Sequence, residues 1–162
     1  MSKTHQYRTT TRWTGNAGLG TRDYKAYRRD HRVDAPGKQH PILCSSDPAF
    51  RGDPSFYNPE ELLVASLSAC HMLWMLHLCA DAGIVVHDYE DSAEGSMMED
   101  DDGFGWFDEV VLHPRMTIAD ESRIAETVEL HERAHERCFI AASVNFTVRC
   151  EPYVTALPGR VQ

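Results

Sequence analysis

The sequence predicts an α+β fold with a mostly antiparallel sheet. Segments rich in Thr, Tyr and Trp, which are typical of strands, fill the N-terminal third. An apolar run without Gly or Pro over residues 62–82 predicts one long helix, and residues 121–138 predict a second. Strand-like segments separate and follow the two helices. A chain of 162 residues can bury one hydrophobic core, so we expect a single domain over residues 1–162.

Short strands are expected at the N-terminus. Two of them are Tyr7–Thr14 and Thr21–Tyr27, and the glycine-containing segment 15–20 supplies the turn between them. A third is expected at His31–Asp34. Ser-Ser-Asp-Pro and Arg-Gly-Asp-Pro within residues 41–57 then predict a long loop, and long ordered loops often carry functional residues.

The long helix has a defined beginning and end. Asn58 is a favourable N-cap, Pro59 fits the first helical position, and the two glutamates that follow suit the positive end of the helix dipole. Gly83 is a natural stop. The helix is apolar on nearly all sides, which predicts burial in a core or an interface, or a membrane span. His71 and His77 within it favour a core or an interface, so no membrane partner is expected.

After this helix we expect a hairpin. Residues 84–94 and 106–118 are the two strands, and the acidic segment 99–105 is the turn. Pro114 cannot donate a hydrogen bond to a neighbouring strand, so it predicts an edge position or a bulge.

A second helix and a last strand complete the predicted order of elements. Asp120 is the N-cap of the helix, which continues to about Cys138. The last strand is expected at Ser143–Cys150, and the tail from Pro152 to Gln162 is expected to be mobile.

Charge and cysteine usage limit the classes of function. The chain has 16 basic and 25 acidic residues, a net charge of −9 and no basic block, which does not suit binding to nucleic acid. The first twenty residues contain no apolar run, so no secretion signal is expected and the cytoplasm is the expected location. In that reducing compartment, five cysteines are more often reactive, metal-bound or buried than linked in disulfides.

Cys70 and Cys138 are the candidate reactive thiols. Cys70 lies in the middle of the apolar helix, where it is either a buried small hydrophobe or a thiol activated by a nearby cation. Cys138 lies at the end of the second helix, a more accessible position. The other three cysteines, Cys44, Cys79 and Cys150, have no suggestive neighbours and are interpreted as core or surface thiols.

A zinc site is a second interpretation of the same region. His131, His135 and Cys138 are spaced i, i+4, i+7, which places them on one helix face, and Cys70 is a possible fourth ligand. Solvated surface histidines are the plainer alternative. Arg51 and Glu60 have similarly plain alternatives, as a loop charge and as a partner of the helix dipole.

A combined motif extends over these residues. Ser46–Pro54, the helix start Asn58-Pro59-Glu60-Glu61-Leu62 and Ser66–Cys70 together resemble the OsmC/Ohr family of thiol-dependent peroxidases. The family's N-P-E-[EQ]-L helix start, with a cysteine ten residues after its first acid, is matched letter for letter. The resemblance covers roughly residues 5–150. It implies an OsmC-like fold, with antiparallel sheets packed around a long buried central helix, and an intertwined homodimer with active sites at the interface.

The resemblance also implies roles for single residues. Cys70 is similar to the peroxidatic cysteine, Cys138 to the resolving cysteine and Glu60 to the acid that orients an arginine. Arg51 matches the arginine before the N-P-E motif in the OsmC branch, and Arg22 is the alternative, from the first hairpin, that the Ohr branch uses. The chain departs from the family after its second cysteine, where a phenylalanine replaces a frequent proline.

These roles define a mechanism that needs no cofactor. The Cys70 thiolate attacks a peroxide oxygen and becomes a sulfenic acid, which Cys138 converts to a disulfide that a cellular dithiol reduces. The arginine stabilises the thiolate and hydrogen-bonds the peroxide. Met72, Leu73 and Trp74 are expected to line an apolar pocket, which favours organic or lipid hydroperoxides as substrates.

Helix geometry independently favours an assembly of two chains. Glu60 and Cys70 are separated by ten residues, or roughly 15 Å along a straight helix. Either the helix breaks between them or two subunits build the site. A helix that is apolar all round also needs cover on every side, which a homodimer supplies.

Two other classes of function stay open at this point. A zinc-binding or redox-sensing protein would use Cys70, His135 and Cys138 without turnover. A non-catalytic ligand-binding protein would keep the apolar pocket and lose the chemistry.

Overall fold

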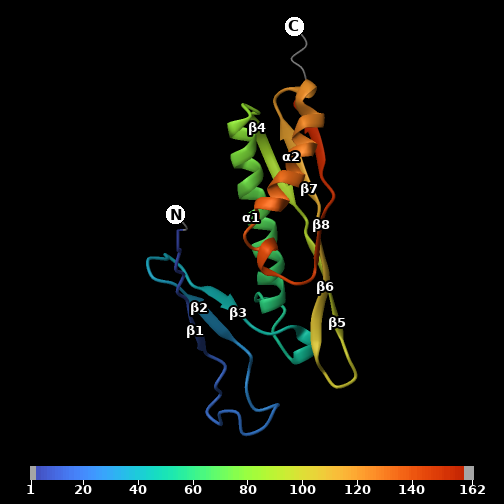
Figure 1. Ribbon diagram of the computed structural model, residues 1–162. Helices are drawn as coiled ribbons and strands as arrows, with labels where there is room; N and C mark the ends of the chain where they lie inside the picture. Colours follow the sequence, from blue (N-terminus) through green and yellow to red (C-terminus); the bar gives the residue numbers. More distant parts are fainter. Residues whose placement is uncertain (1–2, 159–162) are drawn as a thin grey trace. The chain divides into compact units, whose positions relative to one another are not determined.

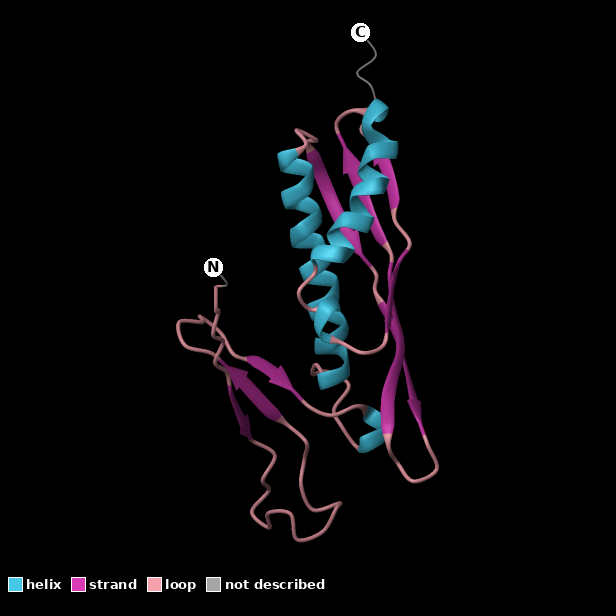
Figure 2. Ribbon diagram, viewed as in Figure 1, coloured by secondary structure: helices cyan, strands magenta, loops and turns pink. Residues whose placement is uncertain are grey.

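The computed structural model describes residues 3–158, and the chain divides into two compact units at Leu63/Val64. Figure 1 labels both α-helices and most of the strands, and Figure 2 distinguishes helices, strands and loops. The first unit is built on an antiparallel sheet with the order β1-β2-β3. Its strands are β1 (Thr10–Trp13), β2 (His31–Asp34) and β3 (Ile42–Cys44).

The N-terminal prediction is confirmed at β1 and β2 and wrong at Thr21–Tyr27, which forms turns. Asp23 explains the difference, because its side chain accepts a hydrogen bond from the Lys25 N–H at 2.7 Å and so favours a turn over a strand. The region 41–57 is not all loop. It contains β3 and a short 3-10 helix, η1 (Pro48–Phe50), whose N-cap is Asp47.

The second unit contains most of the regular structure. The long helix α1 (Pro59–Asp81) begins in the first unit and continues into the second without a break. The elements after it are β4 (Val86–Asp91), β5 (Glu94–Glu99), β6 (Gly105–Leu112), β7 (Pro114–Ile118), η2 (Glu121–Arg123), α2 (Ile124–Arg137), η3 (Ala141–Ser143), β8 (Thr147–Cys150) and β9 (Tyr153–Ala156).

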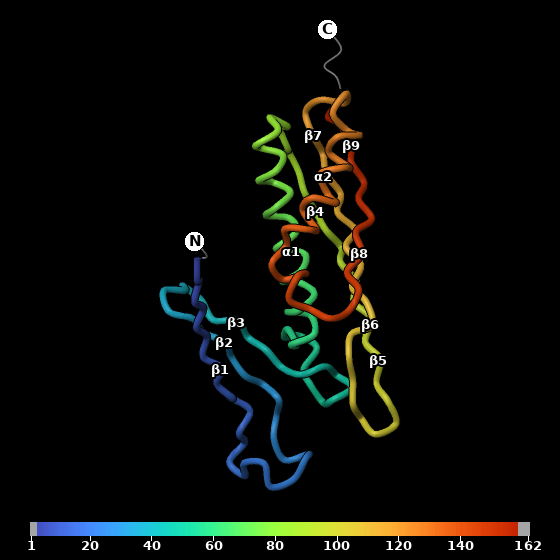
Figure 3. The backbone as a smooth tube through the Cα atoms, in the orientation of Figure 1, coloured from blue at the N-terminus to red at the C-terminus, as the bar shows by residue number. Residues whose placement is uncertain are grey.

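These strands form two three-stranded sheets, β4-β7-β9 and β5-β6-β8. Figure 3 traces the chain through three pairs of consecutive strands: β4 and β5, β6 and β7, and β8 and β9. In each pair, one strand belongs to each sheet. The pairs β4/β7 and β5/β6 are antiparallel, as expected, but β6/β8 and β7/β9 are parallel. Parallel pairing needs a long crossover connection, and here α2 and η3 supply it.

Two expectations at the end of the chain are corrected. Pro114 lies on neither an edge strand nor a bulge: it is the first residue of the central strand β7, where its missing N–H costs little. The expected mobile tail contains β9, which pairs with β7. Residues 159–162 of that tail lie outside the described residues.

The core of the second unit lies between the helices and the sheet β4-β7-β9. Buried residues from α1, α2, β7 and β9, together with one from the connection between α1 and β4, form one cluster: Met75, Leu78, Cys79, Ile84, Met116, Ile118, Leu130, Ala134 and Val154. A smaller cluster joins Leu67 of α1 to Val110 and Leu112 of β6. Both helices therefore pack against strands.

One face of α1 is buried within the chain and the other is not. The buried residues are Leu67, His71, Met75, Leu78 and Cys79, which share a helix face. On another face, Leu73 is 62% exposed and Leu76 is 36% exposed. By length and composition alone α1 also passes a test for a membrane span, a test that the core helices of soluble proteins pass as well.

Candidate functional site

The start of α1 is held by a reciprocal pair of hydrogen bonds. Asn58 Oδ1 accepts from the Glu61 N–H at 2.8 Å, and Glu61 Oε2 accepts from the Asn58 N–H at 3.1 Å. This capping box confirms Asn58 as the N-cap and fixes the start of the helix that carries Glu60 and Cys70. Glu60 is half-buried, and its Oε2 atom has no hydrogen-bond partner among the described residues.

The predicted arginines are both exposed. Arg51 follows η1 in a left-handed backbone conformation, with φ of 68°, and Arg22 lies in a turn. In the part of the chain that the structure describes, neither arginine forms an ion pair with Glu60. The structure therefore does not bring Arg51 and Glu60 together within one chain.

Arg29 is a constrained arginine that the sequence analysis missed. Its guanidinium carbon lies 4.2 Å from the ring centroids of both Tyr24 and Tyr27, and Nη1 donates to the Tyr27 carbonyl at 2.7 Å. Its Nη2 atom is buried without a partner among residues 3–158. The signal in the sequence is a pair of tyrosines two and five residues before an arginine, a pattern suited to cation–π stacking.

Cys70 and Cys138 lie together in the second unit. The two thiols are close enough for Cys70 to affect the ionisation of Cys138, and both are free. Cys70 comes from the middle of α1 and is half-buried, whereas Cys138 is the C-cap residue of α2 and is 2% exposed. The expectation that Cys138 is the more accessible thiol is therefore wrong. Two thiols in contact can form a disulfide after a small movement of the side chains.

The two thiols have different environments. Burial, and then the hydrogen bond with Cys70, raise the pKa of Cys138 to about 11. The Ala141 N–H donates to the Cys138 sulfur at 3.4 Å and offsets a small part of this effect. Cys138 is therefore a protonated thiol at neutral pH, which does not suit it to be the first nucleophile.

A small cavity of about 230 Å³ lies along α1 and is lined by Leu73, Trp74 and His77. Cys70 does not line it, but these three residues follow Cys70 by three, four and seven positions, which places them on the same side of the helix. Met72 is half-buried and does not line it. The ring of Phe139, the residue after Cys138, packs edge-on against Trp74 at 5.8 Å.

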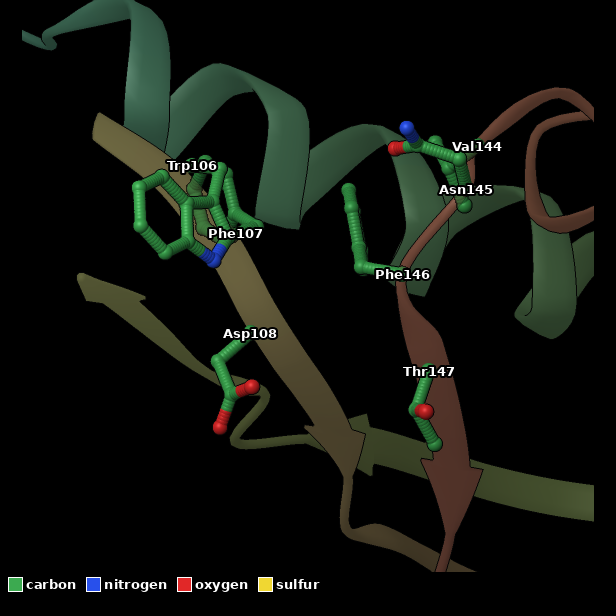
Figure 4. A pocket seen from close by; sticks show the side chains of 7 residues that line it. All are labelled: Trp106, Phe107, Asp108, Val144, Asn145, Phe146 and Thr147. Carbon is green, nitrogen blue, oxygen red and sulfur yellow. The ribbon is translucent and has the colours of Figure 1, made fainter. Parts of the chain in front are cut away.

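A larger cavity of about 570 Å³ lies elsewhere in the second unit, between β6 and β8 (Figure 4). Phe107 and Phe146 both line it, and their rings pack against each other with centroids 5.3 Å apart. It contains no thiol and none of the predicted site residues.

The histidines expected to bind zinc are arranged differently from the prediction. His131 faces His71 of α1 and Cys150 of β8, instead of joining His135, Cys70 and Cys138. The interpretation of Cys150 as a thiol without suggestive neighbours is wrong. Its partners are 79 and 19 residues away in the sequence, so no local spacing indicates the cluster.

Comparison with known proteins identifies the family. The family model for OsmC-like proteins matches residues 52–152, more than half of the chain. The chain belongs to the OsmC-like family. The match includes Glu60, Cys70 and Cys138 but begins just after Arg51. No protein of curated function matches the chain.

Solved structures confirm the OsmC-like fold. An OsmC-like protein of unknown function from Vibrio cholerae is 30% identical, with 93% of this chain and 100% of that chain covered and a TM-score of 0.82. An organic hydroperoxide resistance protein from Elizabethkingia anophelis, with thiocyanate bound, is 17% identical, with 97% and 100% covered and a TM-score of 0.68. A Legionella pneumophila organic hydroperoxide resistance protein is 18% identical, with 95% and 99% covered and a TM-score of 0.67. At these lower identities the likeness concerns the fold.

Proposed function

We propose that this OsmC-like protein is a thiol-dependent peroxidase that reduces organic hydroperoxides through a Cys70–Cys138 disulfide cycle. The observation that carries the proposal is the contact between the two thiols, one half-buried and one buried. Family membership and the names of the Elizabethkingia and Legionella proteins support hydroperoxide chemistry.

The cycle has two steps on the protein. Cys70 sulfur attacks one peroxide oxygen, the O–O bond breaks, and the products are a Cys70 sulfenic acid and an alcohol. The Cys138 thiol then attacks the sulfenic sulfur, forming the disulfide and releasing water. A cellular dithiol reduces the disulfide in the reducing cytoplasm, where we place the protein.

Substrate preference is assigned to the apolar cavity. Leu73 and Trp74 offer apolar contact to an alkyl or acyl chain one turn away from Cys70. Such contact favours organic or lipid hydroperoxides over hydrogen peroxide, because hydrogen peroxide has no apolar surface to bury.

The activating arginine is proposed to come from a partner subunit in a homodimer. Glu60 and Cys70 are both residues of α1 and are ten positions apart, or roughly 15 Å along a helix, so a partner subunit is the proposed source of the remaining site residues. The exposed apolar side chains of Leu73 and Leu76 on α1 offer a surface for a second chain. Arg51, Arg22 and the stacked Arg29 are the candidates.

Mass analysis of the reduced protein tests the cycle after one equivalent of tert-butyl hydroperoxide. We expect a Cys70–Cys138 disulfide in the wild type and in Cys44→Ser, a control thiol outside the pair, but not in Cys70→Ser. Reduced cysteines in the treated wild type would overturn the peroxidase and favour a non-catalytic ligand-binding protein.

A further inference from the structure

Three side chains that the peroxidase cycle does not use converge in the second unit. They are His71 of α1, His131 of α2 and Cys150 of β8. His71 Nε2 lies 2.9 Å from His131 Nδ1, and Cys150 Sγ lies 3.5 Å from the first of these nitrogens and 3.7 Å from the second. Both histidines are almost fully buried, with 1% and 2% of their surfaces exposed.

A histidine pair that serves only packing leaves these contacts poorly explained. The hydrogen bond between the rings joins His71 Nε2 and His131 Nδ1, the same two nitrogens that face Cys150 Sγ. The outer nitrogens, His71 Nδ1 and His131 Nε2, are buried without a partner among the described residues and would carry the ring protons when the inner nitrogens bind a metal. The three atoms that converge are all metal-ligating atoms, which packing alone does not require.

The triangle of atoms fits a tetrahedral zinc ion. With Zn–N of about 2.0–2.1 Å and Zn–S of about 2.3 Å, tetrahedral angles place two nitrogens about 3.3 Å apart and a nitrogen and a sulfur about 3.5 Å apart. The observed S···N distances of 3.5 and 3.7 Å already match. The N···N distance of 2.9 Å needs to open by about 0.4 Å to reach this geometry.

We propose that His71, His131 and Cys150 bind one Zn²⁺ ion, which ties α1, α2 and β8 together at a site separate from the Cys70–Cys138 pair. Two imidazoles and a thiolate select Zn²⁺ over Mg²⁺ or Ca²⁺, which prefer oxygen ligands. On binding, the Cys150 S–H bond breaks, an S–Zn bond forms and one proton leaves to solvent.

The surroundings support a bound cation. Both imidazole rings are buried, an environment that favours the neutral form, which is the form that binds a metal. Asp91, Glu132 and Glu151 carry negative charges near the Cys150 thiol, and Arg149 pairs with Glu151 at 2.6 Å. A divalent cation compensates the charge of the Cys150 thiolate and of the nearby carboxylates that have no such partner in the described part of the chain.

A cavity leaves room for a fourth ligand. It has a volume of about 300 Å³, and its lining includes His131 and Cys150 together with His135, Glu132 and Glu151. His135 lies one turn after His131 but outside the group of converging ligand atoms. We therefore assign the fourth position to a water molecule that reaches the zinc through this cavity.

Zinc content tests the site directly. The purified, reduced wild type is incubated with excess Zn²⁺ and dialysed against metal-free buffer. Its zinc content per chain is then measured by elemental mass spectrometry. We expect about one Zn per chain in the wild type and in the Cys70→Ser/Cys138→Ser variant, and at least a fivefold loss in Cys150→Ser and His131→Gln. Zinc that stays in Cys150→Ser, or is absent from the wild type, overturns the proposal.

Two further measurements use only the wild-type protein, so they remain valid even if a variant fails to fold. Co²⁺ should give an intense visible spectrum with a thiolate charge-transfer band, and Zn²⁺ but not Mg²⁺ should slow alkylation of Cys150 at least tenfold. An unchanged rate at Cys150 contradicts the site. Failure of the peroxidase is separable, because Cys150→Ser should still form the Cys70–Cys138 disulfide and the double serine variant should still bind zinc.

Discussion

The loss of stability on replacing Leu73 by alanine should show whether the protein is a monomer or a dimer. Full burial of a leucine side chain contributes about 1.5–3 kcal/mol. Leu73 is 62% exposed, so one chain buries 38% of it, and truncation should cost about 0.6–1.1 kcal/mol in a monomer. If a second chain covers Leu73, the cost should rise to about 2–5 kcal/mol, the range for a leucine in a core.

Urea unfolding at two protein concentrations measures this cost. Leu67→Ala is the matched control, because Leu67 is 0% exposed within one chain and should cost about 2–5 kcal/mol in either state. For a dimer that unfolds to monomers, a hundredfold increase in concentration adds about 2.7 kcal/mol of apparent stability. A cost of about 1 kcal/mol or less for Leu73→Ala, with an unfolding midpoint that does not depend on concentration, would refute the dimer.

Three further predictions concern single side chains. At pH 8 native Cys138, with its pKa of about 11, should react with iodoacetamide roughly 200-fold more slowly than a free thiol, with the rate rising about tenfold per pH unit; an ordinary rate in the folded protein contradicts this. Asn58→Ala should lower the free energy of unfolding, measured with urea, by about 1 kcal/mol because it breaks the capping box. Asn58→Gly should lower it by only a few tenths of a kcal/mol, and equal costs for the two variants would argue against a capping role. If one arginine activates Cys70, only one of Arg51→Ala, Arg22→Ala and Arg29→Ala should slow disulfide formation at least tenfold in stopped-flow measurements, and three equal rates would remove the arginine from the mechanism.

Local signals in the sequence predicted the helical part of the fold well. Asn58, Pro59 and Gly83 bound α1 as expected, because capping depends on neighbouring residues alone. The parallel pairing of β8 with β6, and of β9 with β7, was not predictable in the same way. It depends on the crossover connection through α2 and η3, which brings together strands that are far apart in the sequence.

The candidate site follows the same division. The family motif contains Cys70 and a second cysteine at a helix end, and in the structure Cys138 contacts Cys70. The cluster at Cys150 has no local signal, because its histidines come from two helices and its thiol from a strand. Periodicity describes which face of one element a residue occupies, but not which face of another element it meets.

The contact between Cys70 and Cys138 links oxidation to the stability of the fold. The two cysteines are 68 positions apart (138 − 70), and a disulfide that closes a loop of this size restricts the unfolded chain by about 4 kcal/mol in the chain-entropy model. The oxidised protein should therefore resist unfolding more strongly than the reduced one. By thermodynamic linkage, folding shifts the reduction potential of this disulfide to a lower value. The dithiol that completes the cycle must therefore be a stronger reductant than the same disulfide would need in an unfolded chain.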